Sequence, residues 1–363
     1  MKISICIPTY GRGDIVYENV LKCLESKNDN IEVVVSDNCS DDNTEELLSK
    51  IEDTRFKYFK NKYNNGADNL ISVLTYATGD YLLLTSDEDT IIIENLEKIM
   101  PILENEKPAI LKGSASLFGN PYMKHRNGVY HKGFEAISVY DSGCKYMSAY
   151  IFCKEIMNKV LDGITGTDIN RRFGYSYNFT NLTREMLQYG SLCFREEILT
   201  DQFAKGKRCE QTYFDGGECC YSVNMRMKAA YEKLDSLKRI ILTERQKYYL
   251  CELYLTKDVV RMYIHEFKNT FDKDLLNELN NNGDDMIYHY YIDNREVLKK
   301  SNTSKDIIKL NNKYIDYIDS IKIFEKPYEM ISQKYKDINN QFIQKRNLMQ
   351  AKFEEEKKRL LDN

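Results

Sequence analysis

The first hundred residues alternate short apolar runs with amphipathic stretches, and this alternation restricts the fold more than any other feature of the chain. Four apolar runs predict strands at residues 3–7, 31–35, 56–59 and 81–85. Three amphipathic stretches predict helices at residues 14–24, 44–51 and 67–77. Strands that alternate with helices form a mostly parallel sheet through right-handed crossovers. The pattern therefore predicts an α/β domain with helices flanking the sheet.

The pattern changes further along the chain. Residues 101–221 combine strand signals at 109–118 and 146–153 with an expected loop at 119–133 and a helix from Lys154. The predicted domain runs over residues 1–221, with halves 1–100 and 101–221, and a helical domain follows at 222–326.

Residues 327–363 contain no Gly or Pro after Pro327 and predict a terminal helix. An approximate heptad seam is compatible with a coiled coil, and hence with a homo-oligomer, but Lys345 interrupts the seam. The alternative is a solvated terminal helix that packs on its own domain.

Charge and hydropathy exclude two classes of protein. The 52 basic and 56 acidic side chains give a net charge of -4, which argues against a nucleic-acid binder. No window approaches the roughly 20 apolar residues that span a bilayer. The first apolar run ends at Pro8, too early for a signal peptide, so we expect a cytoplasmic protein.

An acidic turn follows the apolar run at 81–85. Asp87 and Asp89 stand two positions apart in the sequence Thr85-Ser86-Asp87-Glu88-Asp89. Two such carboxylates can bind one hard divalent cation and leave positions for phosphate oxygens, which suits a nucleoside diphosphate. The alternative is a solvated acidic turn, which is common after strands.

A second acidic residue, Asp37, ends the run that begins at Ile31. Ligands of parallel sheets bind beyond the carboxyl ends of the strands. At that edge a carboxylate can accept hydrogen bonds from a ribose hydroxyl or a base imide. Asp41 and Asp42 have a simpler explanation, as caps of the helix that begins near Thr44.

Four blocks of sequence carry a resemblance to a known family: residues 5–12 (ICIPTYGR), 33–42 (VVVSDNCSDD), 65–69 (NGADN) and 79–89 (GDYLLLTSDED). In order and spacing they resemble the family 2 glycosyltransferases of GT-A fold, whose sheet is Rossmann-like. The resemblance covers residues 1–100 closely and continues loosely to about 220. It implies that 1–100 is the nucleotide-binding half and 101–221 the acceptor half.

The resemblance implies transfer of a sugar from a nucleoside diphosphate sugar, with UDP as the default, to an acceptor hydroxyl with inversion. Asp87 and Asp89 would hold Mn²⁺ or Mg²⁺, with Asp89 as the direct ligand. The residues implied for the donor site are Pro8, Thr9, Tyr10, Arg12, Asp37, Asn69, Ser86, Asp87 and Glu88. For Arg12 and Asn69, loop and helix packing is the alternative.

An inverting transfer also needs a carboxylate that takes the acceptor proton. Many relatives place an acidic pair at the start of a helix, roughly where this chain has residues 177–180, and no carboxylate occupies that position. We predict Asp168 as the base, with Glu185 second and Asp141 more distant. A turn or cap role for Asp168 and an exposed position for Glu185 are the alternatives.

The acceptor is expected to be a glycan, a lipid-linked sugar or a protein, in surface polysaccharide assembly or protein glycosylation. Aromatic residues in 173–179 and 211–218 suit sugar stacking or core packing. A lipid-linked acceptor would place the protein peripherally at the inner face of the membrane. Two readings compete with this one: a sugar nucleotidyltransferase, and a catalytically silent sugar-binding or scaffold protein.

Overall fold

The computed structural model describes residues 1–66, 68–143, 146–164, 168–174, 178–203, 214–215, 218–219, 229, 232–233 and 235–254. The chain divides into two compact units. One comprises Met1–Asp215 with Arg239–Leu242, and the other comprises Gly216–Lys238 with Thr243–Asn363. The candidate site lies in the first unit.

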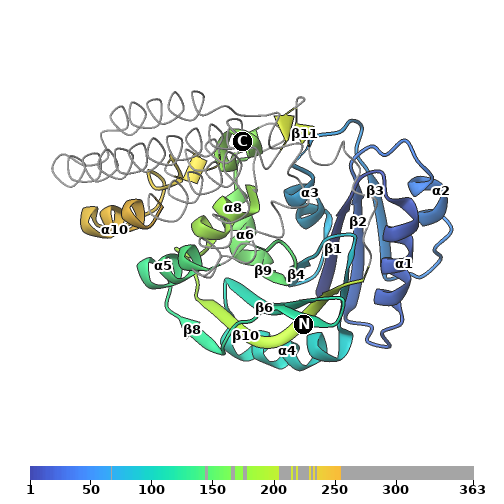
Figure 1. Ribbon diagram of the computed structural model, residues 1–363, viewed down its shortest axis with the longest axis horizontal. Helices are drawn as coiled ribbons and strands as arrows, with labels where there is room; N and C mark the ends of the chain where they lie inside the picture. The colour runs from blue at the N-terminus through green and yellow to red at the C-terminus, as the bar shows by residue number, and fades with distance from the viewer. Residues whose placement is uncertain are drawn as a thin grey trace, which may run out of the picture. The chain divides into compact units, whose positions relative to one another are not determined.

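A mixed sheet of ten strands forms the centre of the first unit, in the part of the chain that the structure describes (Figure 1). Its main path runs β3 (Phe56–Lys60), β2 (Ile31–Asp37), β1 (Ile3–Thr9), β4 (Tyr81–Leu84), β9 (Tyr150–Cys153), β6 (Ile110–Leu117), β10 (Leu192–Gln202) and β5 (Asp89–Ile91). The four strands from β3 to β4 are parallel. Strand β9 is antiparallel to both β4 and β6, and β6 is parallel to β10.

Two short strands lie off this path: β7 (Asn120–Met123) pairs with β6, and β8 (Gly128–Tyr130) pairs with β10. The helices of the first unit are α1 (Gly13–Leu24), α2 (Thr44–Leu48), α3 (Asp68–Tyr76), α4 (Ile93–Glu106), α5 (Phe134–Ser142), α6 (Lys154–Leu161), α7 (Asp168–Phe173) and α8 (Asn178–Met186). Strand β11 (Phe214–Asp215) ends the long segment of this unit, and β12 (Glu218–Cys219) and α10 (Glu244–Tyr254) belong to the second unit.

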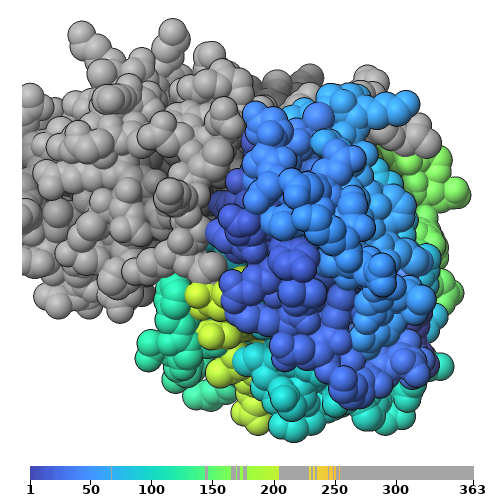
Figure 2. Space-filling model, turned by 90° about the vertical axis from the view of Figure 1, so that its right-hand side faces the viewer, coloured from blue at the N-terminus to red at the C-terminus, as the bar shows by residue number. Residues whose placement is uncertain are grey.

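Helices α1 and α3 cover opposite faces of β1 and β2 (Figure 1). Helix α3 packs on β1, β2 and β4 and also contacts α8. Figure 2 shows the side of this unit that α1, α2 and β3 form, where the blue residues of the N-terminal elements make one continuous surface.

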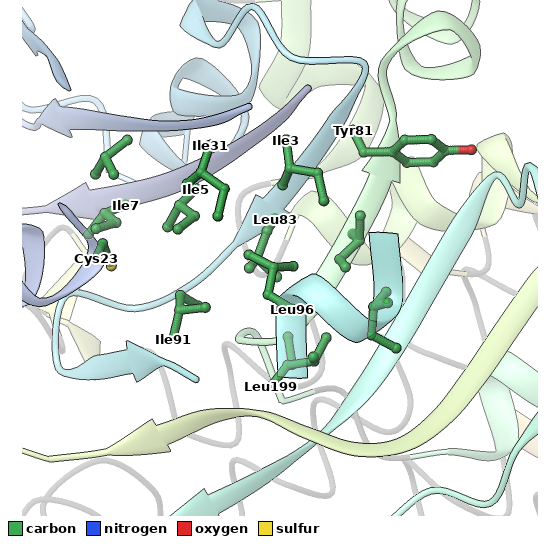
Figure 3. Packing of buried hydrophobic residues seen from close by; sticks show 14 of the residues in the cluster. Ile3, Ile5, Ile7, Cys23, Ile31, Tyr81, Leu83, Ile91, Leu96 and Leu199 are labelled. Carbon is green, nitrogen blue, oxygen red and sulfur yellow. The ribbon is translucent and has the colours of Figure 1, made fainter. Parts of the chain in front are cut away.

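The core lies between the sheet and the helices α1 and α4. Every residue of β1 and β2 is buried, as expected for strands covered on both faces. In Figure 3, Leu96 of α4 lies against Leu83 of β4, and Leu199 of β10 closes the cluster from below. This packing fixes the strand ends from which the candidate site is built.

The seven elements predicted in the first hundred residues are all present, although α2 stops at Leu48 rather than near residue 51. The expected loop at 119–133 is wrong, because it contains β7 and β8. The predicted helices beyond Tyr254, including the terminal helix and its coiled-coil seam, lie outside the described residues. Among the helices that the structure describes, none is long and apolar enough to cross a membrane.

One glycine gives a stability prediction for this sheet. A Cβ at Gly79 would lie 2.8 Å from the backbone nitrogen of Ser4 and 2.9 Å from the carbonyl oxygen of Lys2. Because backbone atoms of a central strand cannot move cheaply, we expect Gly79→Ala to destabilise the fold by about 1–3 kcal/mol. Urea unfolding measures this loss. The control is Gly143→Ala, whose Cβ would make an ordinary 3.5 Å contact, and an equal loss there would contradict the argument.

Candidate functional site

The carboxyl ends of β1, β2 and β4 meet at one edge of the sheet. Thr9 of β1 pairs in register with Asp37 of β2, and the backbone N–H of Thr85, just after β4, donates to the carbonyl of Cys6 at 3.1 Å. The polar segments after these strands therefore lie together, at the edge where ligands of parallel sheets bind.

Asn19, a fully buried residue of α1, hydrogen-bonds to the backbone of the acidic turn after β4. Its side-chain N–H group donates to the carbonyl oxygens of Ser86, Asp87 and Asp89 at 3.4, 3.1 and 3.1 Å. One amide thus fixes the backbone on both sides of Glu88. Sequence reasoning missed Asn19, although a polar residue on the apolar face of a helix was a usable signal.

The Asp87 carboxylate is bonded to residues that follow or end β1. Thr9 Oγ1 donates to Asp87 Oδ2 at 2.8 Å, and Arg12 Nη1 lies 2.8 Å from Asp87 Oδ1. The same guanidinium nitrogen is 3.6 Å from Glu88, and Ser86 Oγ is 3.3 Å from Asp87 Oδ1. Arg12 therefore offsets the charge of Asp87, and both side chains are at least nine-tenths buried.

Asp89 is the first residue of β5 and is 1% exposed. Its Oδ2 accepts hydrogen bonds from Tyr146, at 2.7 Å, and from the Ser148 hydroxyl. Its Oδ1 has no hydrogen-bond partner within the described part of the chain. Burial raises the pKa of Asp89 to about 6, against the two hydroxyl bonds, and the charge of Asp87 adds to the rise.

Lys112 of β6 holds the segment that carries these two hydroxyls. Its buried ammonium donates to the carbonyls of Tyr146, at 2.8 Å, and Ser148, and it lies 4.0 Å from the centre of the Tyr150 ring. Sequence reasoning missed Lys112, Tyr146 and Ser148, because the bonds from Lys112 to this segment and from this segment to Asp89 link positions far apart in the chain.

This arrangement fits one hard cation at Asp89. The buried Oδ1 is a carboxylate oxygen whose hydrogen-bonding capacity no described group uses, and such oxygens are the ligands that Mg²⁺ and Mn²⁺ prefer. Among the residues searched, those that the structure describes, no three acidic, histidine or cysteine side chains form a metal-binding group. A cation here would complete its shell with ligand oxygens and water.

Asp37 lies at the predicted edge but is fully buried. Its Oδ1 accepts from the backbone N–H and hydroxyl of Ser40 at 2.9 and 2.5 Å, and its Oδ2 accepts from the Tyr58 hydroxyl at 2.7 Å. These bonds shape the turn after β2. A contact of Asp37 with a nucleotide stays a prediction.

Asn69 ties the ends of two strands to α3. Its side-chain N–H group donates to the carbonyl of Ser36 at 2.9 Å and its oxygen accepts from the Ser36 hydroxyl at 2.6 Å. The same N–H group is 3.5 Å from the carbonyl oxygen of Thr9. These bonds directly support the alternative that Asn69 packs α3 against the strands rather than binding the donor. Pro8 is buried and Tyr10 is half-buried at the same edge.

Two of the predicted base candidates, Glu185 and Asp141, lie buried in ion pairs. Glu185 is 2% exposed, with Oε2 2.5 Å from Arg172 and Oε1 2.8 Å from Arg239. Asp141 pairs with Arg184 at 2.8 Å, and both side chains are fully buried. The exposed position considered for Glu185 is therefore wrong, and a base role for either residue stays a prediction.

Asp168, the first choice, begins α7, and its side chain is outside the described part of the chain. The same holds for residues 175–177 and 211–213 of the aromatic segments.

Sequence comparison finds a known family that is similar to the first part of this chain. The profile of the family described as "Glycosyl transferase family 2" matches residues 4–144, which include all of the strand ends described above. Among curated proteins, the glucosyltransferase WfaP of Escherichia coli, which acts on a GlcNAc-diphosphoundecaprenol, is 30% identical over 106 residues, covering 29% of this chain and 42% of that protein. Abequosyltransferase RfbV of Salmonella typhimurium is 32% identical over 112 residues, covering 29% of this chain and 34% of that protein. The chain thus spans about two fifths of these relatives or less.

Solved structures show where the fold recurs. The crystal structure of residues 1–349 of TarS from S. aureus in complex with UDP matches with a TM-score of 0.60 at 13% identity, covering 97% of this chain and 92% of that chain. The complex of the same protein with UDP-GlcNAc matches with a TM-score of 0.57 at 12% identity, covering 93% of this chain and 92% of that chain. At this identity the likeness shows a shared fold. The chain therefore shares the fold of these structures, and its residues 4–144 match the family described as "Glycosyl transferase family 2".

Proposed function

We propose that this chain is an inverting glycosyltransferase of GT-A fold that moves a sugar from a UDP-sugar to an acceptor hydroxyl. The observation that carries the proposal is the acidic turn at the ends of β1 and β4, where Asp89 keeps one buried carboxylate oxygen without a hydrogen bond in the described chain. The family match of residues 4–144 supports the same conclusion.

The residues of the turn have distinct proposed roles. Asp89 holds a divalent cation, Mn²⁺ or Mg²⁺, which when bound neutralises charge on the departing diphosphate. Asp87, held by Thr9 and Arg12, orients the turn and faces the donor. Tyr146 and Ser148 fix the rotamer of Asp89 by donating to its other oxygen.

A lipid-linked glycan is the proposed acceptor. WfaP and a relative from Campylobacter jejuni, which is 30% identical over 124 residues, are both named as glucosyltransferases that act on undecaprenol diphosphate-linked sugars. The C. jejuni match covers 33% of this chain and 38% of that protein. We infer the same class of acceptor for this chain, which would work at a membrane surface.

The test is release of UDP by the full chain. UDP-glucose and UDP-N-acetylglucosamine are incubated separately with Mn²⁺, with and without a GlcNAc-diphosphopolyprenol acceptor. We expect UDP release from one donor, stimulation by the acceptor, and loss of release in EDTA. A protein that releases no UDP but forms UDP-glucose and pyrophosphate from UTP and glucose 1-phosphate would be a nucleotidyltransferase. Absence of both reactions would favour the third hypothesis, a catalytically silent sugar-binding or scaffold protein.

A further inference from the structure

The acidic turn carries carboxylates on three consecutive residues, Asp87, Glu88 and Asp89. Like charges this close repel one another, so a turn without outside contacts would move them apart. The structure holds the turn through its backbone. The groups that hold it come from α1, from the residue after β10 and from Ser148, all of them outside the turn.

Every backbone carbonyl of residues 86–89 accepts a hydrogen bond. Asn19 donates to three of them, as described above, and the backbone N–H of Phe203, which follows β10, donates to the fourth, that of Glu88, at 3.1 Å. The backbone oxygens of the turn are thus directed at donors of the protein. We therefore expect a cation to find its protein ligands among the side-chain oxygens.

A neighbour on α1 fixes the orientation of the Asn19 amide. The thiol of Cys23, one helical turn further along and fully buried, donates to Asn19 Oδ1 at 3.8 Å. The amide oxygen therefore faces Cys23 and the amide nitrogen faces the turn. The opposite orientation would bring Asn19 Oδ1 against three carbonyl oxygens. An amide on the buried face of a helix is stable only when such bonds are made.

Ser148 connects the start of the turn to the carboxylate of Asp89. The backbone N–H of Ser86 donates to Ser148 Oγ at 2.9 Å, and the same hydroxyl donates to Asp89 Oδ2. Because a serine hydroxyl has one proton, that proton is committed to Asp89. Asn19 thus fixes the backbone of the turn and Ser148 the carboxylate. Asp89 Oδ1 is left without a hydrogen bond in the described chain.

We propose that Asn19 is a positioning residue that holds the acidic turn in its cation-binding geometry before the cation arrives. It acts through the carbonyl oxygens of the turn, and its neutral amide has no charge of its own to attract a cation. Replacing residues that orient metal ligands from outside typically lowers metal affinity by about 10- to 100-fold. The inference rests on the proposed function, since it takes the cation site at Asp89 as given.

The experiment measures the affinity of the full chain for Mn²⁺ in the presence of excess UDP, from the electron paramagnetic resonance signal of free Mn²⁺. The variant is Asn19→Leu, which has a similar volume but no N–H donor. We expect its dissociation constant for Mn²⁺ to rise by about 10-fold or more. Its affinity for UDP in EDTA should equal that of the wild type, because the cation is then absent in both.

The Mn²⁺ dependence of turnover gives a second readout. UDP release is followed from the donor that the wild type uses faster, UDP-glucose or UDP-N-acetylglucosamine. Asn19→Leu should need about 10-fold more Mn²⁺ for its half-maximal rate, and its rate should approach that of the wild type at saturating Mn²⁺. A residue that only stabilised the fold would lower Tm and leave this Mn²⁺ requirement unchanged.

Asn181→Leu is the matched control. Asn181 of α8 is 2% exposed, and its amide donates to the backbone carbonyl of Phe173 at 2.7 Å. It holds a backbone carbonyl as Asn19 does, but that of a residue in α7. This variant should lose stability and keep the wild-type affinity for Mn²⁺. If either leucine variant fails to fold, the alanine variants of both residues replace the pair, with the same expectations.

The outcomes separate the inference from the proposed function. A wild type that binds no Mn²⁺ beside UDP contradicts the cation site and the inference together. A wild type that binds Mn²⁺ but releases no UDP from either donor contradicts the transferase function, and the Mn²⁺ affinities still decide the inference. Equal Mn²⁺ affinity in the wild type and the Asn19 variant contradicts the inference alone, as does an equal loss in the Asn181 variant.

Discussion

Replacing Asp89 with Asn is expected to lower the rate of UDP release by at least about 100-fold, a loss typical of removing one electrostatic group from an active site. The amide has the same shape, so the bonds from Tyr146 and Ser148 can persist and the fold should be kept. The negative charge that would hold the cation is gone. The rate with Mn²⁺ and a UDP-sugar, measured beside the circular dichroism spectrum, checks this result.

The matched control for that variant lies in the same turn. Glu88 is half-buried, and its contact with Arg12 is a long 3.6 Å. We expect Glu88→Gln to lose less than about 10-fold in rate, because a partly solvated charge contributes little. Equal rate losses in Asp89→Asn and Glu88→Gln would mean that the rate depends on the net charge of the turn. They would contradict a specific role of Asp89 in holding the cation.

Arg184→Met should be the most destabilising substitution in the described unit, at about 3–5 kcal/mol, because it leaves the Asp141 charge buried with its cation removed. Arg184 Nε lies 2.8 Å from Asp141 Oδ1, both side chains are fully buried, and Arg184 also donates to Asn181. The pair joins α5 to α8. Urea unfolding at pH 7 measures the loss.

The double variant Asp141→Asn with Arg184→Met tests this reason for the loss. Removing both charges should restore much of the stability, since the uncompensated carboxylate is then absent. Lys50→Met, which breaks the exposed pair of Lys50 and Glu46, should change stability far less. A double variant no more stable than Arg184→Met would point to lost packing of the arginine stem.

The first hundred residues could be predicted because their structure is local. Hydrophobic periodicity and crossover rules were enough for β1 to β4 and the helices between them, and strand ends locate the acidic turn. Strand β10 was not predicted, because its polar stretch Arg195-Glu196-Glu197 and the register shifts around Ile198 break the alternation of a regular strand.

The partners of the site residues are nonlocal and were not predictable from spacing. Asn19 reaches the turn across 67 to 70 positions, and Ser148 reaches Asp89 across 59. Glu185 has the pattern of an exposed helical residue, yet Arg239, 54 positions away, buries it in an ion pair. Spacing identifies which residues stand at a strand end, and only tertiary packing decides which of their oxygens remain available.

Calorimetric titration of UDP tests the central claim most directly, since it needs neither acceptor nor turnover. The account predicts that the wild type binds UDP with Mn²⁺ present and loses most of that affinity in EDTA, and that Asp89→Asn binds equally weakly under both conditions. UDP binding by the wild type that is unchanged in EDTA, or Mn²⁺-dependent binding that survives in Asp89→Asn, would contradict a cation site at Asp89.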